Sequence, residues 1–189
     1  MRKVFIDAGG HTGDTVKLFL EKYPDSEQFE IFCFEPNPNF AQHHENKEYK
    51  FLPAAVWIAD CKLDFYIAAN PLGSSLMKSK GGRSKLDKKH PVKVEAVDFS
   101  KWVKDNFTKE DFIVLKLDIE GAEYQVIQKM IDDDTIFYVK ELYVDWHARK
   151  LENFDKNIHE NMVDFLTEWT TYRSKKHRRM CGETWEIKR

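Results

Sequence analysis

Residues 5–15 read FIDAGGHTGDT, and this stretch decides the fold. An apolar run at residues 4–6 ends at Asp7, glycines follow at positions 9, 10 and 13, and a helix-compatible segment begins at Asp14. A strand, a glycine turn and a helix in this order open a βαβ unit, whose turn and helix start form one wall of a ligand crevice. Asp7 is expected to point a negative charge into that crevice.

Apolar strand patterns alternate with helical patterns along the rest of the chain. We expect strands at residues 3–7, 29–35, 51–58, 63–68, 92–97 and 112–118, then 137–145, 169–173 and 184–188, with helices at 13–22, 39–46, from 98 onwards, 121–131 and 155–168. This order predicts an α/β fold with a doubly wound, mostly parallel seven-stranded sheet and an antiparallel C-terminal strand pair. A length of 189 residues predicts one domain, 1–189.

The composition restricts the class of protein. A formal charge of −2 argues against a general attraction to nucleic acid or membrane. The chain has no apolar run of about 20 residues, the length that crosses a bilayer, and no signal peptide is expected after Met1. Cys33, Cys61 and Cys181 are odd in number and lack metal-ligand spacing, so we expect buried, reduced thiols in a cytoplasmic protein.

Acidic residues end several of the predicted core strands. Because ligands of parallel sheets lie beyond the carboxyl ends of the strands, these acids should meet at one edge. The residues concerned are Asp7, Glu35, Asp118 with Glu120, and Asp145 with His147. One such acid can simply cap a helix or start a turn, but a set of them at one edge predicts a site.

Glu35 and Asp7 indicate the kind of ligand. Glu35 follows Gly13 by 22 residues, the position from which a carboxylate accepts the hydroxyls of a ribose. A dinucleotide fingerprint would place glycine at Ala8, and an adjacent Asp7 would repel a pyrophosphate. The carboxylate of Asp7 would instead attract the ammonium and sulfonium groups of S-adenosylmethionine. The electrostatics therefore favour the methyl donor over NAD.

Three segments resemble the FkbM-family methyltransferases, which belong to the class I, Rossmann-like group that uses S-adenosylmethionine. They are D-x-G-x-x-x-G at Asp7, Gly9 and Gly13, FEPNP at 34–38, and KLDIEGAE at 116–123. The resemblance extends from about residue 3 to 147 and more weakly to the closing strands. In two places the chain departs from the family pattern: His11 stands where asparagine is common, and Asp145 where glutamate is expected.

The resemblance implies roles for individual residues. The donor-binding set that it implies is Asp7, Gly9, Gly10, Gly13, Glu35, Asn37, Ala55, Val56 and Asp118. Within that set, Glu35 would hold the ribose, and Ala55 and Val56 would flank the adenine. Asp118 and Glu120 would face the transferring methyl group. Ser74 and Ser75 would lie near the acceptor, and Trp146 could border its pocket.

The implied reaction is methylation of a hydroxyl oxygen on a sugar-like or other small acceptor. An alcohol needs a base within hydrogen-bonding reach. His147 is the first candidate because its ordinary pKa suits neutral pH, with Asp118 or Glu120 as the alternative. Alternatively, Asp118, Glu120, Asp145 and His147 could hold a divalent metal that lowers the pKa of the acceptor.

Other interpretations of the sequence stay open. A Gly/Ser-rich basic loop at 70–91, with lysines from Lys78 to Lys93, could hold an anionic acceptor or be a solvated loop. A basic cluster at 173–179 lacks the interleaved aromatic residues that stack on RNA bases. The rivals to a methyltransferase are an NAD-linked oxidoreductase, which Ala8 and Asp7 oppose, and a nucleoside-binding module without turnover.

Overall fold

The computed structural model describes residues 1–70, 73–81 and 85–173. Within these residues, five parallel strands form the central sheet, in the spatial order β3-β2-β1-β7-β8. Their bounds are β1 Lys3–Ala8, β2 Phe29–Phe34, β3 Lys50–Leu52, β7 Phe112–Leu117 and β8 Val139–Val144. The strand order reverses between β1 and β7, which is where open α/β sheets bind ligands.

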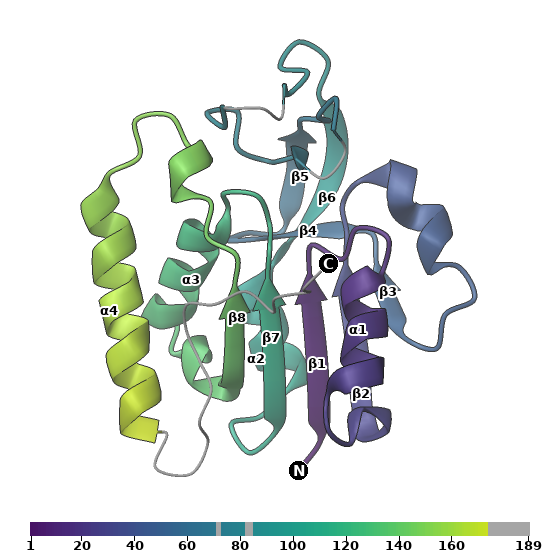
Figure 1. The fold of residues 1–189 in the computed structure, drawn as a ribbon, viewed down its shortest axis with the longest axis vertical. Helices are drawn as coiled ribbons and strands as arrows, with labels where there is room; N and C mark the ends of the chain where they lie inside the picture. Colours follow the sequence, from purple (N-terminus) through teal and green to yellow (C-terminus); the bar gives the residue numbers. More distant parts are fainter. Residues whose placement is uncertain (71–72, 82–84, 174–189) are drawn as a thin grey trace.

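A second, three-stranded sheet lies above the carboxyl ends of the central strands (Figure 1). It has the order β4-β6-β5, with β4 Ala54–Trp57, β5 Cys61–Phe65 and β6 Val92–Asp98. β4 is parallel to β6, and β5 is antiparallel to it. Because this sheet covers the strand ends, its side chains can form the roof of a site there.

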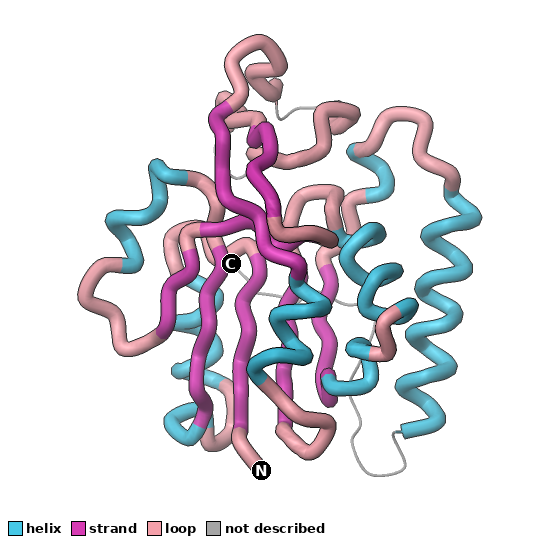
Figure 2. The backbone as a smooth tube through the Cα atoms, turned by 180° about the vertical axis from the view of Figure 1, so that it is seen from behind, coloured by secondary structure: helices cyan, strands magenta, loops and turns pink. Residues whose placement is uncertain are grey.

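Helices cover both faces of the central sheet (Figures 1 and 2). α1 (Asp14–Lys22) packs on one face, and α2 (Phe99–Asn106), α3 (Glu123–Asp132) and α4 (Lys156–Arg173) supply side chains to the core on the other. The shorter 3₁₀ segments are η1 Ser26–Gln28, η2 Pro38–His44, η5 Thr135–Tyr138 and η6 Ala148–Lys150.

The strand sequences divide the core into these two layers by simple alternation. In β1, Val4 and Ile6 belong to the core beneath α2 and α3, whereas Phe5 belongs to the core beneath α1. On the α1 side, Phe5 stacks on Phe19 with ring centroids 3.9 Å apart. Since successive side chains of a strand point to opposite faces, both layers are filled by near-continuous apolar runs.

The structure corrects two expectations about strands. The strand expected at 51–58 is broken at Pro53 into β3 and β4, which join different sheets. Proline has no N–H to donate to a ladder, so the chain changes sheets there. Residues 169–173, expected as a strand, continue α4, because no Gly or Pro interrupts the chain from 156 to 173.

The antiparallel strand pair expected at the C-terminus is therefore not formed by 169–173, and the antiparallel pair that the structure does describe is β5 with β6. The expected strand at 184–188 and residues 174–179 of the basic cluster lie outside the described residues. The mostly parallel central sheet agrees with the expected α/β class, but the expected count of seven strands is corrected: among the described residues the central sheet has five strands, and three more form the separate sheet.

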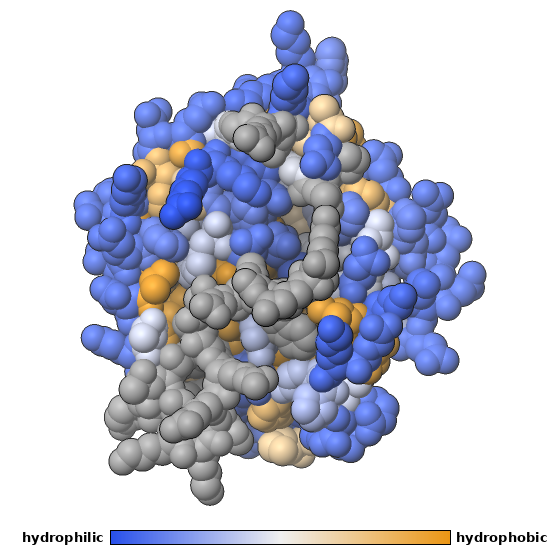
Figure 3. Space-filling model, viewed as in Figure 1, coloured by the Kyte–Doolittle hydropathy of each residue, from blue (hydrophilic) through white to orange (hydrophobic). Residues whose placement is uncertain are grey.

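The face of the molecule that Figure 3 shows is mostly hydrophilic, with apolar residues in scattered patches. No helix in the described part of the chain is both long enough and apolar enough to span a bilayer. Cys33 is buried as expected, whereas Cys61, at the start of β5, is exposed, which corrects the expectation for that thiol. Cys181 lies outside the described residues.

Candidate functional site

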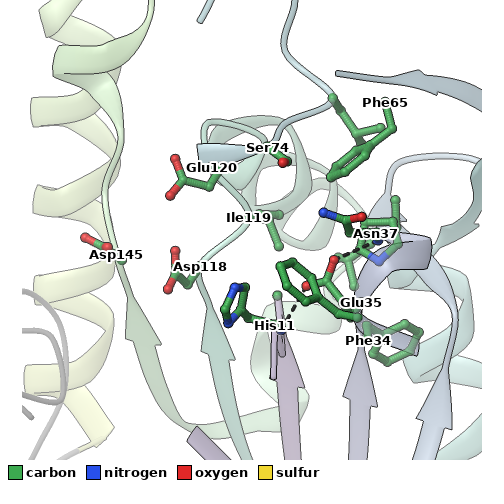
Figure 4. Close-up of a pocket in the computed structure, with 16 residues that line it drawn as sticks. His11, Phe34, Glu35, Asn37, Phe65, Ser74, Asp118, Ile119, Glu120 and Asp145 are labelled. Carbon is green, nitrogen blue, oxygen red and sulfur yellow. Dashed lines mark hydrogen bonds between the residues drawn. The ribbon is translucent and has the colours of Figure 1, made fainter. Parts of the chain in front are cut away.

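A cavity of about 340 Å³ opens beyond the carboxyl ends of β1, β2, β7 and β8, in the size range of small-molecule sites. Its walls come from the turns after these strands, from β4 and β5, and from the segment that follows β5. The lining residues are Gly9, His11, Phe34, Glu35, Pro36, Asn37, Phe40, Ala55, Val56, Phe65, Ser74, Leu76, Asp118, Ile119, Glu120 and Asp145. Figure 4 shows the acids of the last two strands at one end of the cavity and Glu35 with Asn37 at the other.

The glycine turn after β1 is folded back on the end of β2. The N–H groups of Gly9 and Gly10 both donate to the Phe34 carbonyl, at 2.9 Å each. Gly9 has a φ of +87°, and a Cβ there would lie 1.9 Å from the Asp118 carbonyl oxygen. Gly10 packs equally closely, since a Cβ there would lie 2.1 Å from Cys33 Sγ. Only glycine fits both positions.

Glu35 stands at the tip of β2 and is held by the backbone. It is 7% exposed; its Oε2 accepts from the His11 N–H at 2.9 Å and its Oε1 from the Asn37 N–H at 2.7 Å. Burial raises the pKa of Glu35, although these two N–H groups favour the carboxylate. Each carboxylate oxygen keeps acceptor capacity for a further donor, such as a ribose hydroxyl.

Asp7 lies beneath the cavity and does not line it. It is fully buried, and its Oδ1 is 3.0 Å from Lys116 Nζ, on the neighbouring residue of β7 in the sheet register. Lys116 Nζ also donates to the Gly9 carbonyl at 2.8 Å. The expectation that Asp7 charges the crevice is therefore corrected: Lys116 pairs with that carboxylate, and the two side chains support the glycine turn from below.

The turn after β7 carries Asp118 and Glu120. Buried Glu123, at the start of α3, accepts from the Ile119 N–H at 2.9 Å and from the Gly121 N–H at 2.9 Å. Glu120 has a φ of 54°, and Ser75 Oγ donates to its carbonyl at 2.7 Å. These bonds fix the backbone in a conformation that a glutamate rarely adopts, so the turn is held in place by its surroundings.

His147 follows β8 and lies behind this acid cluster. Its side chain is 1% exposed; its Nδ1 is 2.9 Å from Glu123 Oε1, and its Nε2 is 3.3 Å from Glu120 Oε1. Burial lowers its pKa, but the carboxylates of Glu120 and Glu123 outweigh burial and raise it to about 10. Burial would raise the pKa of Glu120, but His147 and Lys80 outweigh burial and lower this pKa to about 2.

An imidazole with this pKa is protonated at neutral pH and does not fit the role of general base that the sequence suggested for His147. Glu120, with its lowered pKa, is likewise a weak base. Asp118 and Asp145 line the cavity with side chains 34% and 45% exposed. The structure thus separates buried groups that hold the cluster from carboxylates that a ligand can reach.

The segment 73–81 closes one side of the cavity. Ser74 lines the cavity, as the resemblance implied, whereas Ser75 is buried and binds the Glu120 backbone. Lys80 belongs to this segment, and its side chain is buried. Its Nζ donates to the Gly73 carbonyl at 2.5 Å and pairs with Glu120 Oε2. This lysine therefore ties the segment to the acid cluster.

The structure brings most of the sequence-predicted residues to the cavity: Gly9, Glu35, Asn37, Ala55, Val56, Ser74, Asp118, Glu120 and Asp145 line it. Gly10 and Gly13 shape the turn but do not line the cavity. Trp146 does not border it either, because its ring packs between Tyr124 and His159, 5.1 and 5.3 Å away. His147 is in the wall behind Glu120.

Sequence reasoning missed the partners that hold these residues. Lys116 and Glu123 are part of KLDIEGAE, yet the motif by itself indicates no role for them, and the sequence pattern places Lys80 in a basic loop with other lysines. The register of β1 with β7 could have signalled Lys116, since it places Lys116 beside Asp7. Nothing local in the sequence distinguishes buried Lys80 from exposed Lys78.

Most of the chain matches the model of a known protein family. The model described as the methyltransferase FkbM domain matches residues 7–174, which include the glycine turn, the end of β2, the turn after β7 and His147. No curated protein and no solved structure gives a significant match. The matched region contains every residue that lines the cavity. On that match, the chain belongs to the FkbM family of methyltransferases.

Proposed function

We propose that this protein transfers the methyl group of S-adenosylmethionine to a hydroxyl oxygen of a small, uncharged, sugar-like acceptor. The family supplies methyl transfer. The nature of the donor and of the methyl acceptor is inferred from the cavity: Glu35, which can bind ribose hydroxyls, lies at one end, three carboxylates lie at the other, and Gly9, which has no Cβ, forms part of the wall.

The hydrogen bonding of the glycine turn is the observation on which the choice of donor rests. The N–H groups of Gly9 and Gly10 bind the Phe34 carbonyl, that of His11 binds Glu35, and that of Gly13 binds the Gly10 carbonyl. A pyrophosphate held by a Rossmann turn needs such N–H groups for itself. With the turn bonded internally and acids around it, a cationic nucleoside is favoured over NAD.

The residues of the cavity would divide the work of holding the donor. Glu35 would accept the ribose hydroxyls, while Ala55, Val56 and Phe65 offer apolar surface for the adenine. Asp118 would face the positive charge of the sulfonium. These assignments place the reactive end of the donor beside Glu120, Asp145 and Ser74, which leaves this end of the cavity for the acceptor.

When bound, the donor supplies a methyl group on sulfur: the acceptor oxygen forms the new O–C bond as the C–S bond breaks, and the electron pair stays on sulfur. The chain contributes alignment of the two partners. It also provides carboxylates within the cavity, Asp118 and Asp145, to take the proton that the hydroxyl loses. The products are a methyl ether and S-adenosylhomocysteine.

The charges of the site favour an uncharged acceptor. Three carboxylates line the acceptor end of the cavity, Asp118, Glu120 and Asp145. Several cations of the basic segment are paired within the chain, which reduces their capacity to hold an anion. These pairs are Lys80 with Glu120, Lys88 with Glu152 at 3.6 Å, and Lys93 with Asp64 at 2.8 Å.

Turnover tests this proposal. Incubation of the protein and S-adenosylmethionine with a panel of neutral sugars, anionic sugars and aliphatic alcohols should release S-adenosylhomocysteine with members of the neutral hydroxylated group. A variant with Glu35→Gln should do so more slowly at low donor concentration. Donor binding without turnover on any acceptor would instead indicate the nucleoside-binding module, and transfer only to anionic acceptors would contradict the acceptor class.

A further inference from the structure

The starting observation is a buried nitrogen that makes no hydrogen bond. His147 Nε2 is buried and unpartnered, although three carboxylate oxygens surround it: Glu120 Oε1 at 3.3 Å, Asp145 Oδ2 at 3.7 Å and Asp118 Oδ1 at 3.9 Å. Leaving a buried polar atom without a hydrogen-bond partner is unfavourable. No carboxylate makes a well-aligned hydrogen bond to this nitrogen, and a divalent cation that displaces its proton would lie among the same oxygen atoms.

The spacing of these atoms is close to that of ligands on one ion. One ligand atom from each of Asp118, Glu120 and His147 lies within 4.8 Å of the other two. Around an octahedral ion with bonds of about 2.1 Å, neighbouring ligand atoms are about 3 Å apart and opposite ones about 4.2 Å. The side chain of Asp118 is 34% exposed, with its other oxygen, Oδ2, 3.5 Å from Lys116 Nζ, so the solvent side leaves room for the small adjustment that remains.

The ring of His147 is already oriented for this role. Its Nδ1 is bonded to Glu123 Oε1 at 2.9 Å, and Glu123 is itself fixed by the Ile119 and Gly121 N–H groups. Histidine ligands of metals usually donate the second ring N–H to such a carboxylate, which turns the lone pair of the other nitrogen toward the ion. The turn that carries Asp118 and Glu120 is thus connected to the histidine through one side chain.

The charges and the donor types decide which ion fits. Lys80 pairs with Glu120 Oε2, and Lys150 Nζ lies 3.2 Å from Oε2 and 3.5 Å from Oε1, the oxygen that faces His147. Carboxylate oxygens with a single imidazole suit hard divalent ions such as Mg²⁺ and Mn²⁺. Asp145 is close enough to act as a further ligand or to bind a water of the ion.

We propose that Asp118, Glu120 and His147 bind a hard divalent cation, Mg²⁺ or Mn²⁺, at the acceptor end of the cavity. For its role, this inference rests on the proposed function: the ion would bind the acceptor hydroxyl and lower its pKa, which makes the oxygen a better nucleophile. Binding of the ion itself does not depend on the identity of donor or acceptor.

Mn²⁺ added to chelator-treated protein tests the site directly. Calorimetry should show one saturable Mn²⁺ per chain, and pulsed EPR of the complex should show the nitrogen coupling of a coordinated imidazole. The variants Asp118→Asn and His147→Gln should each weaken binding at least 10-fold, and His147→Gln should abolish the nitrogen coupling. The matched control is Asp105→Asn, an exposed acid of α2, which should bind as the wild type does.

Absence of saturable binding to the folded wild-type protein would overturn the proposal. So would equal affinities for Asp118→Asn and Asp105→Asn, or a bound Mn²⁺ without nitrogen coupling. Thermal melting shows whether His147→Gln is folded, and Asp118, whose side chain is about one-third exposed, provides a second variant that leaves the core intact. Binding of S-adenosylmethionine in the presence of chelator separates the two proposals. If the donor binds and the protein shows no Mn²⁺ binding, only the metal site is wrong. If Mn²⁺ binds but the donor does not, the proposed function is wrong.

Discussion

Glu35 combines two tasks in one side chain, since it fixes the turn after β1 through the His11 N–H and presents a carboxylate to the cavity. Glu35→Gln keeps the size of the side chain and removes its charge. We expect the affinity for S-adenosylmethionine to fall by roughly 10- to 100-fold, because hydrogen bonds to charged groups contribute about 1.5–3 kcal/mol. Calorimetry measures this, with Glu30→Gln on the same strand as the control; equal affinities for the two variants would remove the ribose role of Glu35.

The environment of Glu35 also predicts how donor binding depends on pH. Burial raises the pKa of Glu35 above its ordinary 4.5, against the opposing effect of the Asn37 and His11 N–H groups. The carboxylate, which accepts the ribose hydroxyls, is therefore lost as the pH falls through this raised pKa, so affinity is full above it and declines by up to about tenfold per pH unit below it. Calorimetry over a pH series that runs from neutral down to the ordinary pKa of 4.5 should show this decline in the wild type and a flatter profile in Glu35→Gln.

Lys116 stabilises the protein through the charge that it pairs. Lys116→Met leaves Asp7 buried without a partner, and breaking a buried pair in this way lowers the free energy of unfolding by about 3–5 kcal/mol. Urea denaturation measures the loss. The exposed pair of Lys50 with Glu30 is the control, for which Lys50→Met should change stability by less than about 1 kcal/mol.

The double variant Asp7→Asn with Lys116→Met completes this test. It removes both charges, so it should be clearly more stable than Lys116→Met alone. If the single variant unfolds at the same urea concentration as the wild type, the ion pair does not support the glycine turn as described.

The acids of the site are predictable at the level of single residues, because Glu35, Asp118 and Asp145 each follow an apolar strand. Their partners are not predictable in this way. Lys116 pairs with Asp7 across two strands that are more than 100 residues apart in sequence, and only the sheet register brings the two together. The expectation for Asp7 is wrong because the environment of its carboxylate depends on β7, which the sequence of β1 does not show.

At the level of elements, Lys80 attaches the segment 73–81 to the acid cluster. Lys80→Met should open this segment, so amide hydrogen exchange in 73–81 should accelerate by roughly 10- to 100-fold, in line with about 1.5–3 kcal/mol for hydrogen bonds of a charged group. Turnover should fall with it, whereas donor affinity should stay within about threefold of wild type, since within the described residues the ammonium of Lys80 bonds to Gly73 and Glu120 and not to Glu35.

Lys78 offers a matched control for Lys80, because it lies on the same segment and is exposed. Lys78→Met should leave exchange and turnover unchanged. Equal exchange rates in the two variants would show that the segment is held by other contacts, such as the bond from the Gly81 N–H to the Lys150 carbonyl at 2.7 Å.

Elements with strong local patterns were predicted closely, and those that depend on distant partners were not. β1, β2 and β7 agree with their apolar runs to within a residue or two. The segment 51–58 reads as one strand, but Pro53 divides it between two sheets, and the second of these forms only by pairing with β6, about 40 residues later. At 169–173, residues of high β-propensity follow a helix that has no stop signal, and the helix continues.

At the level of the whole molecule, the sequence predicts the parallel sheet and the edge at which the site lies, because strand ends and glycine turns are local signals. It does not predict the roof of the cavity. That roof comes from β4, β5 and the segment after β5, whose position over the central sheet depends on contacts between distant parts of the chain.

The central claim is that this cavity binds S-adenosylmethionine, with Glu35 at its ribose. Titration of the wild-type protein with S-adenosylmethionine, and with NAD in parallel, tests it most directly. We expect one S-adenosylmethionine per chain and, at 100 times its Kd, about 2.7 kcal/mol of added stability, with no such effect of NAD. Saturable binding of NAD with none of S-adenosylmethionine would contradict the account.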